Sequence, residues 1–199
     1  MAESPYAPPE AAVETQDVGS GQEYFVVSIT KLVVLTILTL NLYLVYWFYR
    51  NWRIIKIRLE DDIWPPMRGL FYIFFTHSLF GLVNDTLKEK GKDFNWSPSG
   101  AATIVVVITL FNNLSDRVLP RVMDEAVAAA VGVLVFFLLP ISMIKPQRAI
   151  NAACDDENGS ANANFTVWNW LWMIAGGLLW LVIVLGVVVM FTDPELLVE

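Results

Sequence analysis

The sequence predicts an all-α integral membrane protein: a helical bundle of four to five transmembrane helices with an amphipathic extension at the membrane surface. Of its 199 residues, 56% are hydrophobic and only 17% are charged, whereas soluble domains average about 45–50% and about 25%. The charged residues also cluster between long stretches that carry almost none, which is typical of proteins that cross a membrane several times. We expect a single domain at this length.

Both ends of the chain are predicted to be acidic tails. Residues 1–23 contain Pro, Ala, Gly and acidic residues without any Lys or Arg, a composition that cannot bury a core and predicts disorder. Residues 192–199 form a shorter acidic tail, so the predicted transmembrane domain is 24–191. The N-terminal tail lacks the basic start and apolar core of a signal peptide, and insertion should therefore depend on the first apolar segment.

The first predicted span is residues 25–49, because about 20 apolar residues cross a hydrocarbon layer of about 30 Å. The helical pattern continues over residues 50–63, where apolar side chains recur on one face beside Arg and Lys. This pattern predicts the amphipathic extension at the membrane surface. The proline pair at residues 65–66 should end it, since proline lacks the amide hydrogen that a helix needs.

Four more apolar segments follow, at residues 67–84, 100–118, 123–144 and 165–191. The first two of these are near the lower length limit for a span, so each could be tilted, partly embedded or re-entrant. A polar connector at 145–164 separates the last two segments and could hold a short helix at 146–153.

The distribution of basic residues predicts the orientation, since Lys and Arg favour the cytoplasmic side of short loops. The N-terminal tail has none, whereas residues 50–68 hold five. We therefore expect the N-terminus to lie outside and residues 50–68 to lie in the cytoplasm.

The aromatic run at residues 43–52 has three possible interpretations: a surface that stacks on nucleic-acid bases, a box around a ligand, or an anchor at the membrane interface. At 100° per residue its rings point in all directions around the helix, whereas a ligand site would gather them on one side. An interface selects such a belt, with Arg reaching lipid phosphates. The last segment begins with a second belt. The predicted anchors are Tyr46, Trp47, Tyr49, Arg50, Trp52, Arg53, Trp168 and Trp170.

Polar side chains within the apolar segments are the candidates for a functional site, because ionisable groups are costly in a membrane. The alternative is structural: a lysine reaching the surface, a neutral histidine bonded to its own helix, or asparagines bonded between helices. The residues that could line a polar path are Lys31, His77, Asn84, Asn112 and Asn113.

Catalytic and cofactor motifs are missing from the sequence. One His and one Cys cannot build a conventional zinc site, and neither a serine-nucleophile elbow nor a phosphate-binding Walker loop occurs. A net charge of −7 with acidic ends excludes nucleic acid as an expected partner. We expect no enzymatic activity, no cofactor and no metal.

Several short motifs resemble those of a family of short bacterial inner-membrane proteins that cross the membrane several times and have no assigned activity. The motifs are Ser28, Lys31 and Leu32 before "LYLVYWFYRNW", then "PPMRGLFYIFF" with "SLF", then "KPQRAIN", then "FTVWN". The family usually shows Thr-Phe-Gly-Leu-Tyr where this chain has Thr39 to Tyr43, so its glycine is replaced. The resemblance implies a bacterial cytoplasmic membrane protein and no catalytic residue.

The predicted function is that of a non-enzymatic accessory or scaffold subunit of that membrane. Its expected partners are membrane lipids, including anionic headgroups, and the further candidates are a membrane-protein partner or a second copy of the chain. The alternative is a small channel or transporter that uses the polar path near Lys31 and His77, because interrupted helices often flank a transport site.

Overall fold

The computed structural model describes residues 22–192, so most of the predicted N-terminal tail and nearly all of the C-terminal one lie outside it. The described part is all-helical and contains no strand, which confirms the all-α class. Its elements are α1 (Ile29–Leu38), α2 (Leu42–Leu59), α3 (Pro65–Leu70), α4 (Tyr72–Glu89), α5 (Pro98–Val118), η1 (Leu119–Arg121), α6 (Glu125–Ser142), α7 (Ile144–Ala153), η2 (Ser160–Asn162) and α8 (Val167–Thr192).

Three helical stretches in the described chain are long and apolar enough to cross a membrane: Pro98–Ser115, Val127–Ala153 and Val167–Val189. They correspond to the last three predicted segments, and the second of them joins α6 to α7. Most of their residues face outward, with only 11% buried in the stretch within α8, as expected for helices surrounded by lipid. Three candidate spans replace the four or five that the sequence predicts.

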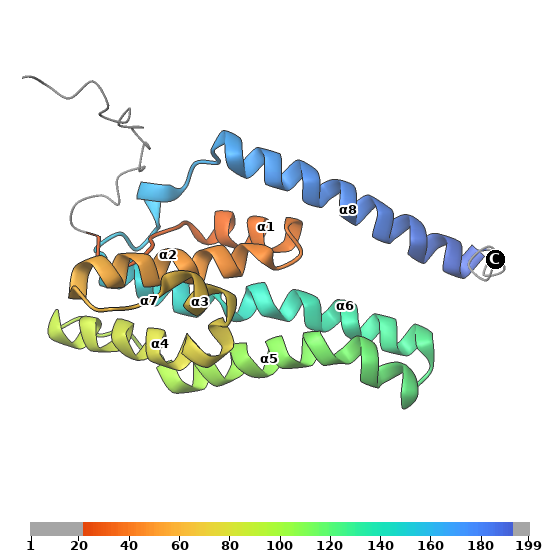
Figure 1. The fold of residues 1–199 in the computed structure, drawn as a ribbon, viewed down its shortest axis with the longest axis horizontal. Coiled ribbons are helices and arrows are strands. Elements are labelled where there is room, and N and C mark those ends of the chain that lie inside the picture. Colours follow the sequence, from red (N-terminus) through yellow and green to blue (C-terminus); the bar gives the residue numbers. More distant parts are fainter. Residues whose placement is uncertain (1–21, 193–199) are drawn as a thin grey trace, which may run out of the picture.

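The predicted first span is wrong, because residues 25–49 form a hairpin of two helices. α1 ends at Leu38, and Leu40 and Asn41 take left-handed conformations with φ of 52° and 69°. α2 then runs back beside α1 (Figure 1), and the Arg58 guanidinium donates to the Tyr24 hydroxyl at 3.2 Å. The residues before α1 and those at the end of α2 therefore lie at the same end of the molecule, which contradicts their predicted separation by the membrane.

The turn between α1 and α2 satisfies its own backbone. The amide of Thr39 donates to the Leu35 carbonyl at 3.0 Å, that of Asn41 to the Thr36 carbonyl at 2.8 Å, and that of Leu42 to the Thr39 carbonyl at 3.0 Å. A bilayer offers no water to unpaired amides, so a turn at membrane depth needs internal partners of this kind. Asparagine also tolerates the left-handed conformation better than most residues.

A second hairpin replaces the predicted span at 67–84. α3 packs against α2, ends at Leu70, and is followed by α4, which runs in the opposite direction (Figure 1). The proline pair occupies the first two positions of α3. Backbone amides at these positions have no hydrogen-bond partner within a helix, so a helix can begin with proline. Leu70, Phe71 and Phe74 are exposed at the tip, so this hairpin also ends in an apolar surface.

The loops and helix ends opposite these tips gather at one end of the molecule, which we call the polar end. α5 leads away from it, α6 and α7 return, and α8 leads away again (Figure 1). The polar end comprises residues 22–28, 56–62, 87–97 and 154–166.

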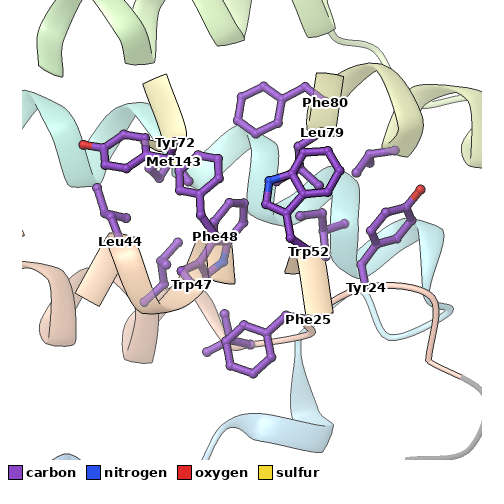
Figure 2. Packing of buried hydrophobic residues seen from close by; sticks show 14 of the residues in the cluster. Tyr24, Phe25, Leu44, Trp47, Phe48, Trp52, Tyr72, Leu79, Phe80 and Met143 are labelled. Atoms are coloured by element: carbon purple, nitrogen blue, oxygen red, sulfur yellow. The ribbon is translucent and has the colours of Figure 1, made fainter. Parts of the chain in front are cut away.

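The aromatic run of α2 forms the centre of the hydrophobic core near the polar end (Figure 2). Trp47 and Trp52 are both 0% exposed, and the ring of Phe48 stacks on that of Tyr72 at 4.6 Å. Because α1, α3, α4 and α7 lie around α2, most of its rings meet protein, although Tyr46 is 43% exposed. The prediction of membrane-interface anchors is therefore wrong for Trp47 and Trp52, and Ile55 and Ile63 of the predicted surface extension are buried as well.

The hairpin makes a topological prediction that single-cysteine labelling can test. In a Cys154→Ser background, we expect Gln22→Cys and Asp61→Cys to react with a membrane-impermeant maleimide from the same side of sealed vesicles. Val122→Cys, which lies between α5 and α6, should react only from the other side. Labelling of positions 22 and 61 from opposite sides would restore a continuous first span.

Candidate functional site

The extended segment before α1 is buried, and side-chain amides from distant helices bind its backbone. The Phe25 amide donates to Asn51 Oδ1 at 3.0 Å. Asn151 accepts from the Val27 amide at 3.4 Å and donates to the Val27 carbonyl at 3.0 Å. Gln147 donates to the Phe25 carbonyl at 3.3 Å. These bonds replace the sheet or helix partners that a buried backbone otherwise needs.

The same three amides are joined to one another through Trp47. Its indole donates to Gln147 Oε1 at 2.5 Å, and Asn51 donates to its carbonyl at 3.0 Å. Gln147 also donates to Asn151 Oδ1 at 2.7 Å. All four side chains are fully buried, so losing one of them leaves other polar groups unpaired.

The loop after α7 is shaped by Asp156. Its carboxylate accepts from the amides of Ala161 at 2.8 Å and Ser160 at 2.9 Å, and the bonds from Ala161 and then from the Ser160 hydroxyl lower the pKa of Asp156. Gly159 has a φ of 65°, and a Cβ there would lie 2.4 Å from the Val27 carbonyl carbon. Only glycine allows the loop to come this close to the extended segment.

Two lysines of the α4–α5 connection fix where the loop begins. Lys90 donates to the Ala153 carbonyl at 2.7 Å, and Lys92 donates to the Ala152 carbonyl. Both also pair with Asp155, at 3.2 and 2.6 Å, and these bonds, the one from Lys92 foremost, lower the pKa of Asp155. Cations at the C-terminal end of α7 also stabilise the helix dipole.

This arrangement leaves a cavity of about 430 Å³ between the loop, the extended segment and the α1–α2 hairpin. We call it the cationic cavity, because two basic side chains line it and no Asp or Glu does among the residues described. The polar side chains that line it are Gln22, Lys31, Tyr43, Tyr46, Arg50, Asn162, Asn164, Thr166 and Asn169.

Lys31 reaches this cavity from the first turn of α1 and is only 3% exposed. Its ammonium donates to Asn162 Oδ1 at 2.7 Å and to the Asn164 carbonyl at 2.6 Å. Both acceptors are neutral, so neither cancels the positive charge, and an ammonium has a third hydrogen to donate. A buried charge of this kind is stabilised by a counter-ion.

Arg50 is the second cation and comes from α2. Its guanidinium carbon lies 5.2 Å from the centre of the Phe25 ring and 6.0 Å from that of Tyr46. The Nε atom is buried without a hydrogen-bond partner in the described chain. Arg50 therefore brings a second positive charge to the cavity, which suits a carboxylate or a phosphate.

The predicted polar path is not assembled. Of its members only Lys31 lines the cationic cavity. His77 lies on the exposed side of α4, with Nε2 3.1 Å from the Thr103 hydroxyl, and Asn84 is half-buried elsewhere on that helix.

Asn112 and Asn113 belong to a different cavity, of about 530 Å³, beside the tips of the two hairpins. Asn112 donates to the Val135 carbonyl at 3.3 Å, and Asn113 donates to the Thr109 carbonyl at 2.7 Å. These contacts bind helices to each other or close a helical turn, which is the structural alternative for both residues.

The remaining predicted anchors divide between α2 and α8. Tyr46 and Arg50 line the cationic cavity, while Tyr49 and Arg53 are half-buried on α2. Trp168 and Trp170, at the start of α8, are 70% and 55% exposed, so their rings are free to meet lipid.

Sequence reasoning missed the two cavity residues that bind Lys31, since Asn162 and Asn164 stand 131 and 133 positions further along the chain. The only signal is the repeated Asn in the segment before α8. No protein-family model, curated protein or solved structure matches this chain in the three comparisons. The functional interpretation therefore depends on the geometry of the cavity.

The amide cluster makes a prediction about stability. Asn151→Leu keeps the volume of the side chain but leaves the Val27 amide and carbonyl unpaired. We expect unfolding in mild detergent to begin at a clearly lower temperature, corresponding to about 2–6 kcal/mol for two buried unsatisfied groups. Asn95→Leu, at an exposed position, is the matched control. An unchanged melting temperature for Asn151→Leu would show that the cluster contributes little.

The loop makes a prediction about pH. Because folding lowers the pKa of Asp156, its carboxylate stabilises the loop fully above the ordinary pKa of 3.8, and this contribution is lost as the pH falls further. Hydrogen exchange at residues 157–166 should therefore accelerate, relative to the helices, as the pH falls below that value. Asp156→Ala should show fast exchange at neutral pH as well, whereas Glu157→Gln, an exposed neighbour, should behave as wild type.

Proposed function

We propose that the chain is a non-enzymatic accessory protein of a bacterial cytoplasmic membrane and that its cationic cavity binds a phosphate-bearing anion. The observation that carries this proposal is the buried charge of Lys31, whose two partners are neutral oxygens. Arg50 lines the same cavity and adds a second positive charge. Two cationic side chains in a cavity of this size suit a phosphate, which has three or more acceptor oxygens.

The proposed membrane arrangement has three spanning helices and two hairpins that enter from one side. The three spans are α5, α6 with the first part of α7, and α8, while the α1–α2 and α3–α4 hairpins reach part of the way. Lys56, Arg58, Lys88, Lys90 and Lys92 lie at the polar end, and Arg117 and Arg121 lie at the opposite one. The positive-inside rule then puts the polar end in the cytoplasm, in place of an external N-terminus.

The accessory role is supported by the surface of α8. This helix contacts α1 over a limited stretch, its Trp180 ring packs on Phe136 and Phe137 of α6, and most of its side chains are exposed. Lipid, a membrane-protein partner or a second copy could cover it. A channel is a weaker proposal, because Lys31, His77 and Asn112 lie at three separate positions in the fold and do not line one path.

Thermal unfolding of the full chain in detergent tests the anion proposal. We expect inorganic phosphate to raise the melting temperature more than chloride at the same ionic strength, because only phosphate binds the folded state specifically. Arg50→Gln should weaken the apparent affinity for phosphate by about 10–100-fold, the usual effect of losing a charged hydrogen bond.

Arg53→Gln is the matched control, since Arg53 is on the same helix and does not line the cavity. It should leave the phosphate response as in wild type. Equal responses in wild type and Arg50→Gln, or no response in either, would contradict the proposal.

A further inference from the structure

The cationic cavity continues into a second, apolar one. This apolar cavity has a volume of about 400 Å³, and Leu35, Leu42, Trp168 and Trp172 line it where the cationic cavity ends. Tyr43, Tyr46, Thr166 and Asn169 line both. A single molecule could therefore occupy both cavities, with its charge in one and its apolar part in the other.

The apolar cavity lies deeper along α1 than the cationic one. A helix rises about 1.5 Å per residue, so Leu35 is one turn, about 6 Å, further from the polar end than Lys31. Beyond it, α8 closes against the tip of α1. A Cβ on Gly176 would lie 1.7 Å from the Leu38 carbonyl oxygen, and the Trp180 indole donates to the Ile37 carbonyl at 2.9 Å.

The apolar cavity is also open to the surroundings of the helices. Leu42 is 63% exposed, and Trp168 and Trp172 are exposed beside it. In a bilayer these side chains meet lipid, so an acyl chain can enter the cavity from the side without passing through water. A free phosphate would leave this apolar cavity unfilled, whereas an amphiphile fills both.

We propose that the two cavities together hold one anionic phospholipid, with its phosphate on Lys31 and Arg50 and one acyl chain between the α1–α2 hairpin and α8. This inference rests on the proposed function, because it assigns the anion to a lipid headgroup. The polar side chains that line the cationic cavity around the two cations, among them Asn169 and Thr166, can bond the rest of the headgroup. The combined volume is within the range of small-molecule sites.

Native mass spectrometry of the full chain in detergent tests the inference. With dioleoylphosphatidic acid we expect one retained lipid per chain, and with dioleoylphosphatidylcholine, whose headgroup has no net charge, at least tenfold less. Arg50→Gln should lower phosphatidic acid retention by about 10–100-fold, and excess inorganic phosphate should compete with it. Arg53→Gln is again the control.

A second variant separates the lipid from the anion. Leu42→Trp adds bulk at an exposed position of the apolar cavity and should reduce lipid retention while the melting temperature still rises with inorganic phosphate. That response also shows that the variant is folded.

A phosphate response with no selective retention of phosphatidic acid, or retention that Leu42→Trp leaves unchanged, would overturn the lipid inference and leave the proposed function intact. No response to either phosphate or lipid would overturn both.

Discussion

The structure depends on one interaction, the binding of a buried extended backbone by the amides of Asn51, Gln147 and Asn151. An extended segment without sheet partners cannot be buried unless something else takes its hydrogen bonds. Here α2 and α7 supply those partners, so the positions of these two helices and of the segment are fixed together. The fully buried Trp47 of α2 then joins the two helices through its indole, which donates to Gln147 of α7, while its carbonyl accepts from Asn51 one turn further along α2.

This constraint also determines where the charges of the site lie. Ser28 caps α1 directly after the extended segment, and the first turn of the helix carries Lys31. Asn162 binds the segment at the Val26 carbonyl at 3.0 Å and accepts from the Lys31 ammonium. The same loop therefore positions both the extended segment and the Lys31 ammonium. A substitution that breaks either contact should change the shape of the cationic cavity.

The three apolar helices α5, α6 and α8 could be predicted from the sequence because their hydrophobicity is a local property. The α1–α2 hairpin could not, since Leu40 and Asn41 interrupt the helix by their left-handed conformations, and a single Asn in an apolar stretch does not predict a turn. One continuous apolar helix and a hairpin of two apolar helices give the same pattern of hydrophobicity along the sequence. A continuous span ending in α2 would place the aromatic rings of α2 against lipid, whereas most of these rings form the core.

The site was predictable only in part, and the reason is sequence separation. Lys31 stands out as a lysine in an apolar helix, but nothing near it in the chain reveals that its partners are Asn162 and the Asn164 carbonyl. The choice of those partners is the strongest argument for a ligand. Were the role of the lysine only to hold the loop, a carboxylate would bind it more tightly in the same place. Neutral partners hold the ammonium in position and leave its charge available to an anion.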